Sequence, residues 1–435
     1  MSAKKLLSGL VLLSVVAFGA YATGQKESTK STSSTATASN AQPIVFTAGG
    51  SGPDPAFFTE MLSKLKSPKA VFHPLSGTSN NQVSYYIERL AAGSSTPDIM
   101  NMDIGWPAQF YSAGWLLPVD KYVPKSELDK FVPAYVHALT VQGHLVAFPG
   151  QADSLLLYYR TDLLKKYGFN GPPKTWAELV HQAQVILKGE NNPNLSGFLW
   201  QGANIEGLLE NYLEFLWGMG GSILNSEGKV AINRPKNVEA LQLMIDMFQK
   251  YHVSPPGITT MATDPSRVAF EDGRAIFLLN WNYCWSQFQS KDSAVKGEVG
   301  QALPPTSGPQ YSSHVALGGW QLAINKYTKD PQAAIKVAEY MSSTECQTQR
   351  ILQISELPTR LDVYTNPTVD NQVPWLPGYL SIIQSGKNRP RSPEYNEVSK
   401  AIRDELSAAL AGIKTPQQAM NDAQAALQKL TILPE

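Results

Sequence analysis

Apolar and polar residues alternate along this chain in two ways. Short apolar runs predict strands, and longer segments in which apolar residues recur every three or four positions predict helices. In the segment 79–93, for example, one helical face carries Val83, Ile87, Leu90 and Ala91. The expected elements in the first third of the chain are a strand at 43–50, a helix around 57–65, a strand near 70–75, the helix in 79–93, a strand at 98–103, a helix at 106–114, and two strands, 143–150 and 154–160, that meet at 151–153.

Several helix starts are marked by their capping residues. Thr175 and Glu178 form the spacing of a capping box, in which each side chain accepts a hydrogen bond from the other's backbone N–H. A capping side chain also precedes a proline at Asp330-Pro331, Ser392-Pro393 and Thr415-Pro416. Strands that alternate with helices predict α/β layers with mainly parallel sheets. The 435 residues exceed one ordinary core, so we expect two lobes.

The N-terminus has the pattern of an export signal. Lys4 and Lys5 precede an apolar run at 6–20, and Ala20-Tyr21-Ala22 is a small-x-small cleavage pattern. We therefore expect a signal peptide at 1–22 and a periplasmic or extracellular protein. Without cleavage, the run at 6–20 would tether the chain to a membrane. The small and polar residues 23–42 predict a disordered leader.

Composition removes several classes of function. The 36 basic and 36 acidic residues balance and form no block of like charge, so nucleic-acid binding is not expected. The chain lacks the Gly-rich phosphate loops, the GxSxG elbow and the HExxH motif. Its six histidines are scattered, so we expect no metal and no cofactor. Among them, His314 lies nearest to the suspected site. Cys284 and Cys346 could pair in an exported protein, and the sequence leaves this open.

Aromatic residues gather at one point where a strand is expected to end. The stretch LLNWNYCW carries Trp281, Tyr283 and Trp285 at alternate positions. Alternate residues of a strand share a face, so the first two rings can line one wall. Asp103 and Asp153 also lie at expected strand ends. Carbohydrates pack their C–H faces on aromatic rings and present hydroxyl groups to polar partners, so a cleft with both is suited to a sugar.

The chain resembles a known family in several separated segments. They are DIMNMDIGWPAQFYSAGWLLPVDKYV, ADSLLLYYRTDLLKKYGFNGPPKTWAEL, GFLWQGANIEGL, NWNYCW, LGGWQLAINKY, LPTRLDVYTNP and NRPRSPEYNEVS. In order and interval they are similar to the trehalose/maltose-binding proteins of ABC importers, which are extracellular solute-binding proteins related to the maltose-binding protein. The resemblance runs from about Pro43 to the C-terminus.

This resemblance implies a periplasmic-binding-protein fold of two α/β lobes that grip a ligand between them and close by a hinge. By similarity, one lobe comprises 43–150 and 314–357, and the other comprises 152–313 and 358–435. The chain would cross between them near Gly150, His314 and Pro358.

The resemblance also assigns roles to individual residues. Asp103 matches a carboxylate that accepts hydrogen bonds from sugar hydroxyls, although it could instead cap the next helix. Asp153 matches a cleft acid just after the first crossover. Trp281 and Tyr283 match the aromatic platform, while Trp285 could belong to the core.

In the GGW segment, Gly318 and Gly319 would let the backbone approach the ligand, and Trp320 would supply another ring or pack in the core. Arg389 matches a basic donor that would contact sugar oxygens or brace a cleft acid, with Arg391 as its rival.

Two positions are less settled. Asp54 lies where the family often has an acidic contact, but it could equally cap a helix. Gln151 stands where the family commonly has an aromatic residue, so a ring is exchanged for an amide in the expected site. Trehalose itself is therefore in doubt, and another disaccharide or a larger glucoside is as reasonable.

The function that the resemblance implies is capture of a disaccharide or small oligosaccharide by a monomer and its delivery to the transmembrane subunits of an ABC permease, without chemistry on the ligand. Two alternatives remain open at this stage. A glycoside hydrolase would use Asp103 and Asp153 across the glycosidic bond. A binder of a non-sugar solute, such as a polyamine, would use similar acids and rings, although an arginine in the cleft disfavours a cation.

Overall fold

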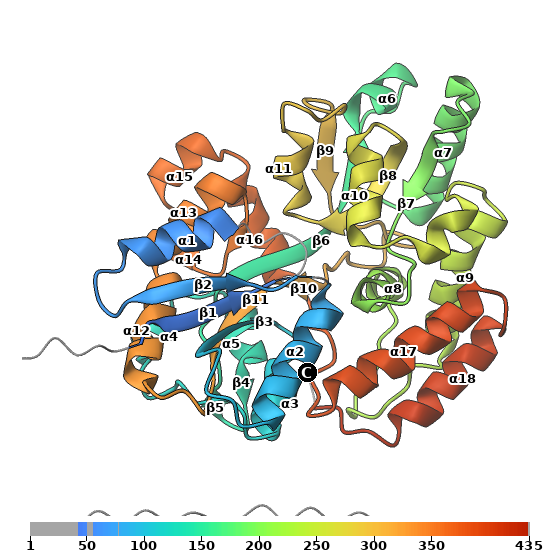
Figure 1. The fold of residues 1–435 in the computed structure, drawn as a ribbon. Helices are drawn as coiled ribbons and strands as arrows, with labels where there is room; N and C mark the ends of the chain where they lie inside the picture. Colours follow the sequence, from blue (N-terminus) through green and yellow to red (C-terminus); the bar gives the residue numbers. More distant parts are fainter. Residues whose placement is uncertain (1–41, 50–54, 77, 434–435) are drawn as a thin grey trace, which may run out of the picture. The chain divides into compact units, whose positions relative to one another are not determined.

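The computed structural model describes residues 42–49, 55–76 and 78–433 of the chain (Figure 1). The expected signal peptide at 1–22, all but the last residue of the expected leader, and Asp54 lie outside these residues. Within the described part, no helix combines the length and apolar character needed to cross a membrane.

The first sheet is built from the strands expected near the N-terminus and one strand from later in the chain. β1 pairs in parallel with both β2 and β3, and β11 runs antiparallel to β3. This pairing places Trp320 directly opposite Asp103. The strands in sheet order are β11 (Trp320–Ile324), β3 (Ile99–Asp103), β1 (Ile44–Ala48) and β2 (Ala70–Pro74).

The second sheet is organised around one long strand, β6 (Gln151–Arg160). Two strands were expected to meet at 151–153, but these residues already belong to β6. Its first residues pair with β10 and β12, and its later residues pair with β8 and β9, all antiparallel. Only β7 and β8 form a described parallel pair here, so this sheet is more mixed than the sequence pattern predicts. The other strands are β7 (Ser196–Leu199), β8 (Ala275–Trp281), β9 (Val299–Ala302), β10 (Leu317–Gly318) and β12 (Leu357–Pro358).

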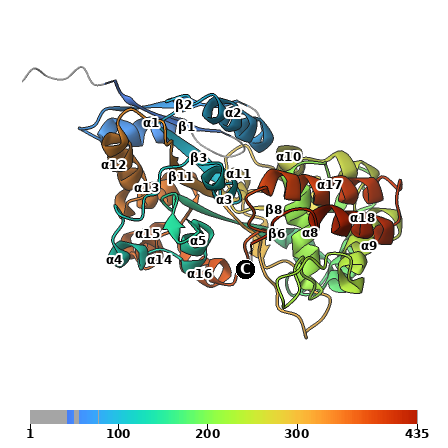
Figure 2. The same ribbon diagram turned by 90° about the horizontal axis from the view of Figure 1, so that it is seen from below.

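Helices flank both sheets (Figures 1 and 2). Those beside the first sheet are α1 (Pro55–Lys64), α2 (Ser79–Ala91), α3 (Pro107–Ser112), α12 (Pro331–Met341) and α13 (Thr344–Ile354). Those around the second are α6 (Thr161–Lys166), α7 (Trp176–Glu190), α8 (Glu206–Gly218), α9 (Pro235–Gln249), α10 (Thr263–Glu271), α11 (Cys284–Phe288), α17 (Tyr395–Leu410) and α18 (Pro416–Leu427). The shorter elements are α4 (Lys125–Leu128), α5 (Pro133–Ala138), β4 (Thr140–Val141), β5 (His144–Leu145), the 3-10 helix η1 (Pro256–Thr260), α14 (Leu361–Tyr364), α15 (Pro367–Gln372) and α16 (Leu376–Gln384).

Three of the four expected helix starts are confirmed at their caps. The Thr175 hydroxyl accepts a hydrogen bond from the Glu178 N–H, although the Glu178 carboxylate accepts from the Lys174 N–H instead of completing the box. Asp330 caps α12, and Thr415 forms a full capping box on α18. The start expected at Ser392-Pro393 is wrong, because α17 begins only at Tyr395, although the Ser392 hydroxyl does accept the Glu394 N–H over 2.8 Å while it donates to the Thr431 carbonyl.

Helix α2 buries a partly polar face. Val83 and Leu90 are buried as expected, whereas Ile87 is half-buried and Ala91 is exposed. Gln82 and Tyr86 are buried in their place because both reach backbone carbonyls of the first sheet. The Gln82 amide donates to Asn101 O over 2.7 Å, and the Tyr86 hydroxyl donates to Thr47 O over 3.1 Å.

Two separate hydrophobic cores hold these elements together. One contains the apolar residues of β1, β3, β11 and their helices, and the other contains those of β6, β7, β8 and theirs. Cys346 is buried in the first and Cys284 in the second, and both thiols are free. The pairing that the sequence left open is therefore not formed. The residue limits given above for the two lobes stay a prediction.

Candidate functional site: a cleft lined by indole rings and carboxylates

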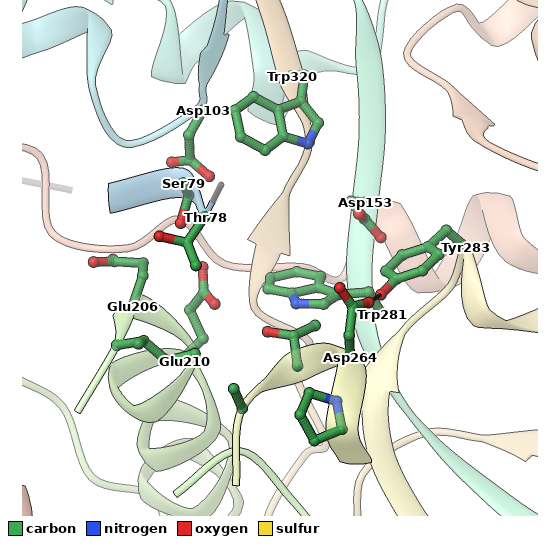
Figure 3. A pocket seen from close by; sticks show the side chains of 16 residues that line it. Thr78, Ser79, Asp103, Asp153, Glu206, Glu210, Asp264, Trp281, Tyr283 and Trp320 are labelled. Atoms are coloured by element: carbon green, nitrogen blue, oxygen red, sulfur yellow. Dashed lines mark hydrogen bonds between the residues drawn. The ribbon is translucent and has the colours of Figure 1, made fainter. Parts of the chain in front are cut away.

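A cavity of about 210 Å³ lies where the ends of β3 and β11 face the end of β8 and the start of α8 (Figure 3). Both sheets therefore contribute to its wall. The lining residues are Thr78, Ser79, Asp103, Asp153, Ile205, Glu206, Gly207, Glu210, Ala262, Thr263, Asp264, Pro265, Trp281, Tyr283, Gly319 and Trp320.

Two half-buried indole rings reach this cavity from different sheets. Trp320 begins β11, and its ring packs edge-on against Trp106, with the ring centroids 5.7 Å apart. Trp281 ends β8. Figure 3 shows the two rings between Asp103 on one side and Asp153 on the other. Flat apolar faces next to hydrogen-bond acceptors are the two kinds of surface that a carbohydrate requires.

The glycines before Trp320 make room for the site's own parts. A Cβ atom on Gly318 would lie 2.5 Å from the Trp281 ring, so this indole can occupy its position only against a bare backbone. Gly319 has a φ of +101°, and a Cβ there would lie 2.2 Å from Gln151 O in β6. Of the two, only Gly319 lines the cavity. The sequence suggested that the backbone of these glycines would approach a ligand. In the structure it approaches other atoms of the protein.

Tyr283 lines the cavity for a different reason from the one expected. β8 ends at Trp281, and Tyr283 has helical backbone angles immediately before α11, so the two rings do not share a strand face. The turn brings the buried Tyr283 ring to the cavity, where its hydroxyl hydrogen bonds to Asp264 over 3.1 Å. Trp285 lies in α11 and packs on Trp375, outside the lining.

Asp153 lies in β6 with only 6% of its surface exposed. One carboxylate oxygen accepts the Ser154 N–H over 3.0 Å, and the Asp153 N–H donates to the Tyr135 hydroxyl over 3.0 Å. Burial raises the pKa of Asp153 well above its ordinary value, and the negative charges of Glu356 and Asp103 act in the same direction. This carboxyl group is therefore costly to ionise.

Arg389 lies behind the lining and binds three carboxylates. Its guanidinium contacts Asp103, lies 3.0 Å from a Glu206 oxygen and lies 2.8 Å from a Glu210 oxygen. Only 3% of its surface is exposed, and it is not among the lining residues. The sequence suggested two roles for Arg389, contact with sugar oxygens or support of a cleft acid. The geometry matches the second role. Arg391, its rival, donates to the carbonyls of His137 and Thr140.

Glu206 and Glu210 are the lining acids that the sequence reasoning missed. They lie one turn apart at the start of α8, and Glu214 continues the series in a helix that is otherwise almost entirely apolar and buried. Acids repeated every fourth residue in such a helix were the available signal, because a buried carboxylate needs a specific partner. Burial opposes the charge of Glu206, but Arg389, Ser399 and Tyr395 hold its pKa below the ordinary value. Burial raises the pKa of Glu210 well above it.

Two other candidates, Gln151 and His314, are not brought to the cavity, and a third lies outside the described residues. Gln151 is buried at the start of β6 and does not line the cavity. The expected exchange of an aromatic ring for an amide at this position therefore does not alter the cavity wall. His314 lies apart, with its Nδ1 3.0 Å from Ser385 O. Asp54 lies outside the described residues. Within the described chain, no group of three or more potential metal ligands is found.

The buried acids predict that the ligand-free protein becomes less stable as pH rises. Between an ordinary carboxyl pKa of about 4 and their raised folded values, Asp153 and Glu210 keep protons that the unfolded chain releases. The free energy of unfolding should therefore fall with pH in this window, by up to about 1.4 kcal/mol per pH unit for each group. Glu206 has the opposite effect on the free energy of unfolding, because its stabilising contribution is lost as pH falls through its lowered pKa.

Urea unfolding from about pH 4.5 to about pH 8 would measure this slope. The double variant Asp153→Asn, Glu210→Gln should show a flatter profile, whereas the exposed control Glu239→Gln should keep the slope of the parent protein. A stability that rises with pH across this window in the parent protein would contradict the prediction.

Comparison with known proteins gives a consistent result. A family model described as bacterial extracellular solute-binding protein matches residues 69–348. A probable ABC transporter-binding protein of Deinococcus radiodurans is 34% identical over 358 residues, which cover 81% of this chain and 84% of that protein. The maltose-bound structure of MalE3 from T. maritima superimposes with a TM-score of 0.84 and 36% identity, over 89% of this chain and 99% of that one.

A ribitol-bound ABC transporter solute-binding protein from Agrobacterium radiobacter K84 superimposes with a TM-score of 0.80 and 25% identity, over 89% of this chain and all of that one. These likenesses confirm the expected fold class, a two-lobed α/β fold related to the maltose-binding protein.

Proposed function

Because the chain belongs to the bacterial extracellular solute-binding protein family, we propose that it captures a disaccharide or small oligosaccharide in the cleft described above and delivers it to an ABC permease. Its membership makes it the solute-binding component of an ABC transporter. The identity of the solute and the roles of the individual binding residues are what we propose. The apolar run and cleavage pattern at 1–22 would direct export.

The observation that carries the proposal is a cavity in which rings and acids come from both sheets. Asp103 and Trp320 belong to the first sheet, whereas Asp153, Trp281 and the turn residue Tyr283 belong to the second or follow it. The indoles would stack on sugar rings, and the carboxylates would accept hydroxyl hydrogen bonds. A ligand that contacts both sides can shift an open form toward a closed one, because only differential affinity for the two states changes their populations.

The space next to this cavity favours a ligand of more than one sugar ring. A second cavity of about 200 Å³ shares Ser79, Asp103 and Glu206 with the first and continues between α2 and α17. Its other walls carry hydrogen-bonding side chains and the Trp106 ring. A saccharide bound on Trp281 and Trp320 could therefore extend into it.

The relatives support a sugar or sugar-like ligand. Maltose and ribitol are the ligands of the two similar structures above, and both are polyhydroxylated. Trehalose, maltose and a longer glucoside all fit this class. We expect the solute to leave the site chemically unchanged and the closed form to bind the transmembrane subunits of the permease.

A thermal-shift screen of mono-, di- and trisaccharides tests the proposal, because a ligand that binds only the folded state raises the melting temperature with its occupancy. At a concentration of about 100 Kd the stabilisation should be about 2.7 kcal/mol. Product analysis after incubation with the best sugar should find it intact. A flat response to every sugar would overturn the ligand class, and hydrolysis of the sugar would replace the binder with a glycosidase.

A further inference from the structure

The charged residues described in the lining of the first cavity all have the same sign. Five of these lining residues are acids, and none of them is lysine, arginine or histidine, whereas Lys400 and Arg403 line the adjoining cavity. Figure 3 shows the acids on opposite sides of the indole rings. The five acids are Asp103, Asp153, Glu206, Glu210 and Asp264.

Arginines outside the lining of the first cavity balance part of this charge. Arg389 serves three of the acids, Arg403 lies 3.8 Å from Glu206, and Arg267 lies 3.7 Å from Asp264. Arg267 also contacts Glu271, so these three guanidinium groups serve five carboxylates, Asp153 not among them, and negative charge remains without a counter-charge when every acid is ionised. The arginine that seemed to disfavour a cationic ligand therefore does not face the ligand space.

Asp153 is the lining acid that these arginines do not reach. In the described chain it forms no ion pair with lysine, arginine or histidine, and its carboxylate accepts the Ser154 N–H. It is 94% buried, since only 6% of its surface is exposed, yet it lines the cavity. A buried carboxylate that borders a ligand space and has no cation of its own is a site where the ligand can supply the counter-charge.

The position of Asp153 beside Trp281 fixes where such a charge would lie. A Cβ atom on Gly318 would be 2.5 Å from the Trp281 ring and 3.4 Å from the Asp153 Cβ, so the Asp153 side chain and the indole flank the same backbone position. A sugar ring stacked on Trp281 thus directs an edge substituent toward Asp153. An ammonium group there would gain both the carboxylate and the electron-rich indole face.

We propose that the saccharide bound in this cleft carries a free amino group, and that its ammonium is held by Asp153 next to the Trp281 ring. This inference rests on the proposed function and names the chemical class of its ligand. A neutral hydroxyl at the same place would hydrogen bond to the carboxyl group but would not offset the cost of ionising it. An ammonium would donate to the carboxylate and neutralise it.

The test uses matched sugars that differ only at nitrogen. Calorimetric titration of the full chain would compare trehalose with 2-amino-trehalose, and cellobiose with the unacetylated glucosamine disaccharide and with N,N′-diacetylchitobiose. We expect at least one amino sugar to bind ten or more times more tightly than its hydroxyl parent, and the advantage to vanish on acetylation, which keeps the nitrogen but removes its charge. In Asp153→Asn the ratio of the two affinities should fall to about one, whereas the exposed control Asp292→Asn should retain it.

Each outcome separates this inference from the proposed function. Neutral parents that bind as tightly as their amino counterparts would overturn the amino-sugar inference and leave the sugar-binding proposal in place. Binding of spermidine or putrescine without any sugar would overturn both, because the cleft would then recognise a polyamine. An amino-sugar preference that survives in Asp153→Asn would overturn the assignment of the ammonium to this residue. Failure of every amino sugar to bind would overturn the inference whatever the neutral sugars do.

Discussion

Replacement of Arg389 by methionine should lower the free energy of unfolding by about 3–5 kcal/mol, the usual effect of removing one partner from a buried ionic group. The guanidinium contacts Asp103 in β3 and Glu206 and Glu210 in α8, so it joins an element of the first sheet to a helix beside the second. Methionine keeps much of the side-chain volume but leaves three carboxylates without their shared cation.

The measurement is urea unfolding of the purified variant at neutral pH, with Arg274→Met as the control. Arg274 also pairs with an aspartate, but that pair is exposed and should contribute no more than about 1 kcal/mol. The variant Arg389→Lys should recover only part of the loss, because an ammonium cannot place planar donors on three acids at once. A loss of less than about 1 kcal/mol in Arg389→Met would show that these acids are protonated or solvated in the folded protein.

Trp281→Ala should weaken binding of the best saccharide by about 2 kcal/mol or more, which corresponds to roughly 30-fold in Kd. The ring lies at the end of β8, against the bare backbone of Gly318, with its face available to the cavity. Its removal would delete the stacking surface beside Asp153. The half-buried ring contributes less to the core than its neighbours, so we expect the variant to fold.

Calorimetric titration would measure the loss, and circular dichroism would confirm that the variant keeps its fold. The matched control is Trp285→Ala, four residues later, because that indole packs on Trp375 and does not line the cavity. Gly318→Ala should reproduce part of the binding defect, since an added methyl group would displace the Trp281 ring. Near-normal affinity in Trp281→Ala would assign this ring to packing alone.

Local patterns predicted the elements well where the physical cause is itself local. Asp330 and Thr415 begin helices because their side chains satisfy nearby backbone donors, and both caps are confirmed. Ser392 also accepts a nearby backbone N–H, that of Glu394, but it donates to Thr431, a residue 39 positions away, and α17 begins only at Tyr395. Tyr283 had the alternation of a strand, but the strand ends two residues earlier, at Trp281. In both cases a tertiary contact or turn replaced the local preference.

The candidate site divides in the same way. The sequence by itself indicated which acids and rings belong to the site, because the motifs that carry them are contiguous. Asp103, Asp153, Trp281 and Trp320 all line the cavity, although Asp153 lies within β6 and not at the end of a strand. Only the tertiary structure decided that Glu206 and Glu210 join them and that Arg389 stays behind, because the contacts of Arg389 with Asp103, Glu206 and Glu210 link residues about 180 to 290 positions apart. No local pattern shows which buried charged side chain will line the cavity and which will lie behind it. That depends on how separate elements pack and on the energy of placing each charge away from water.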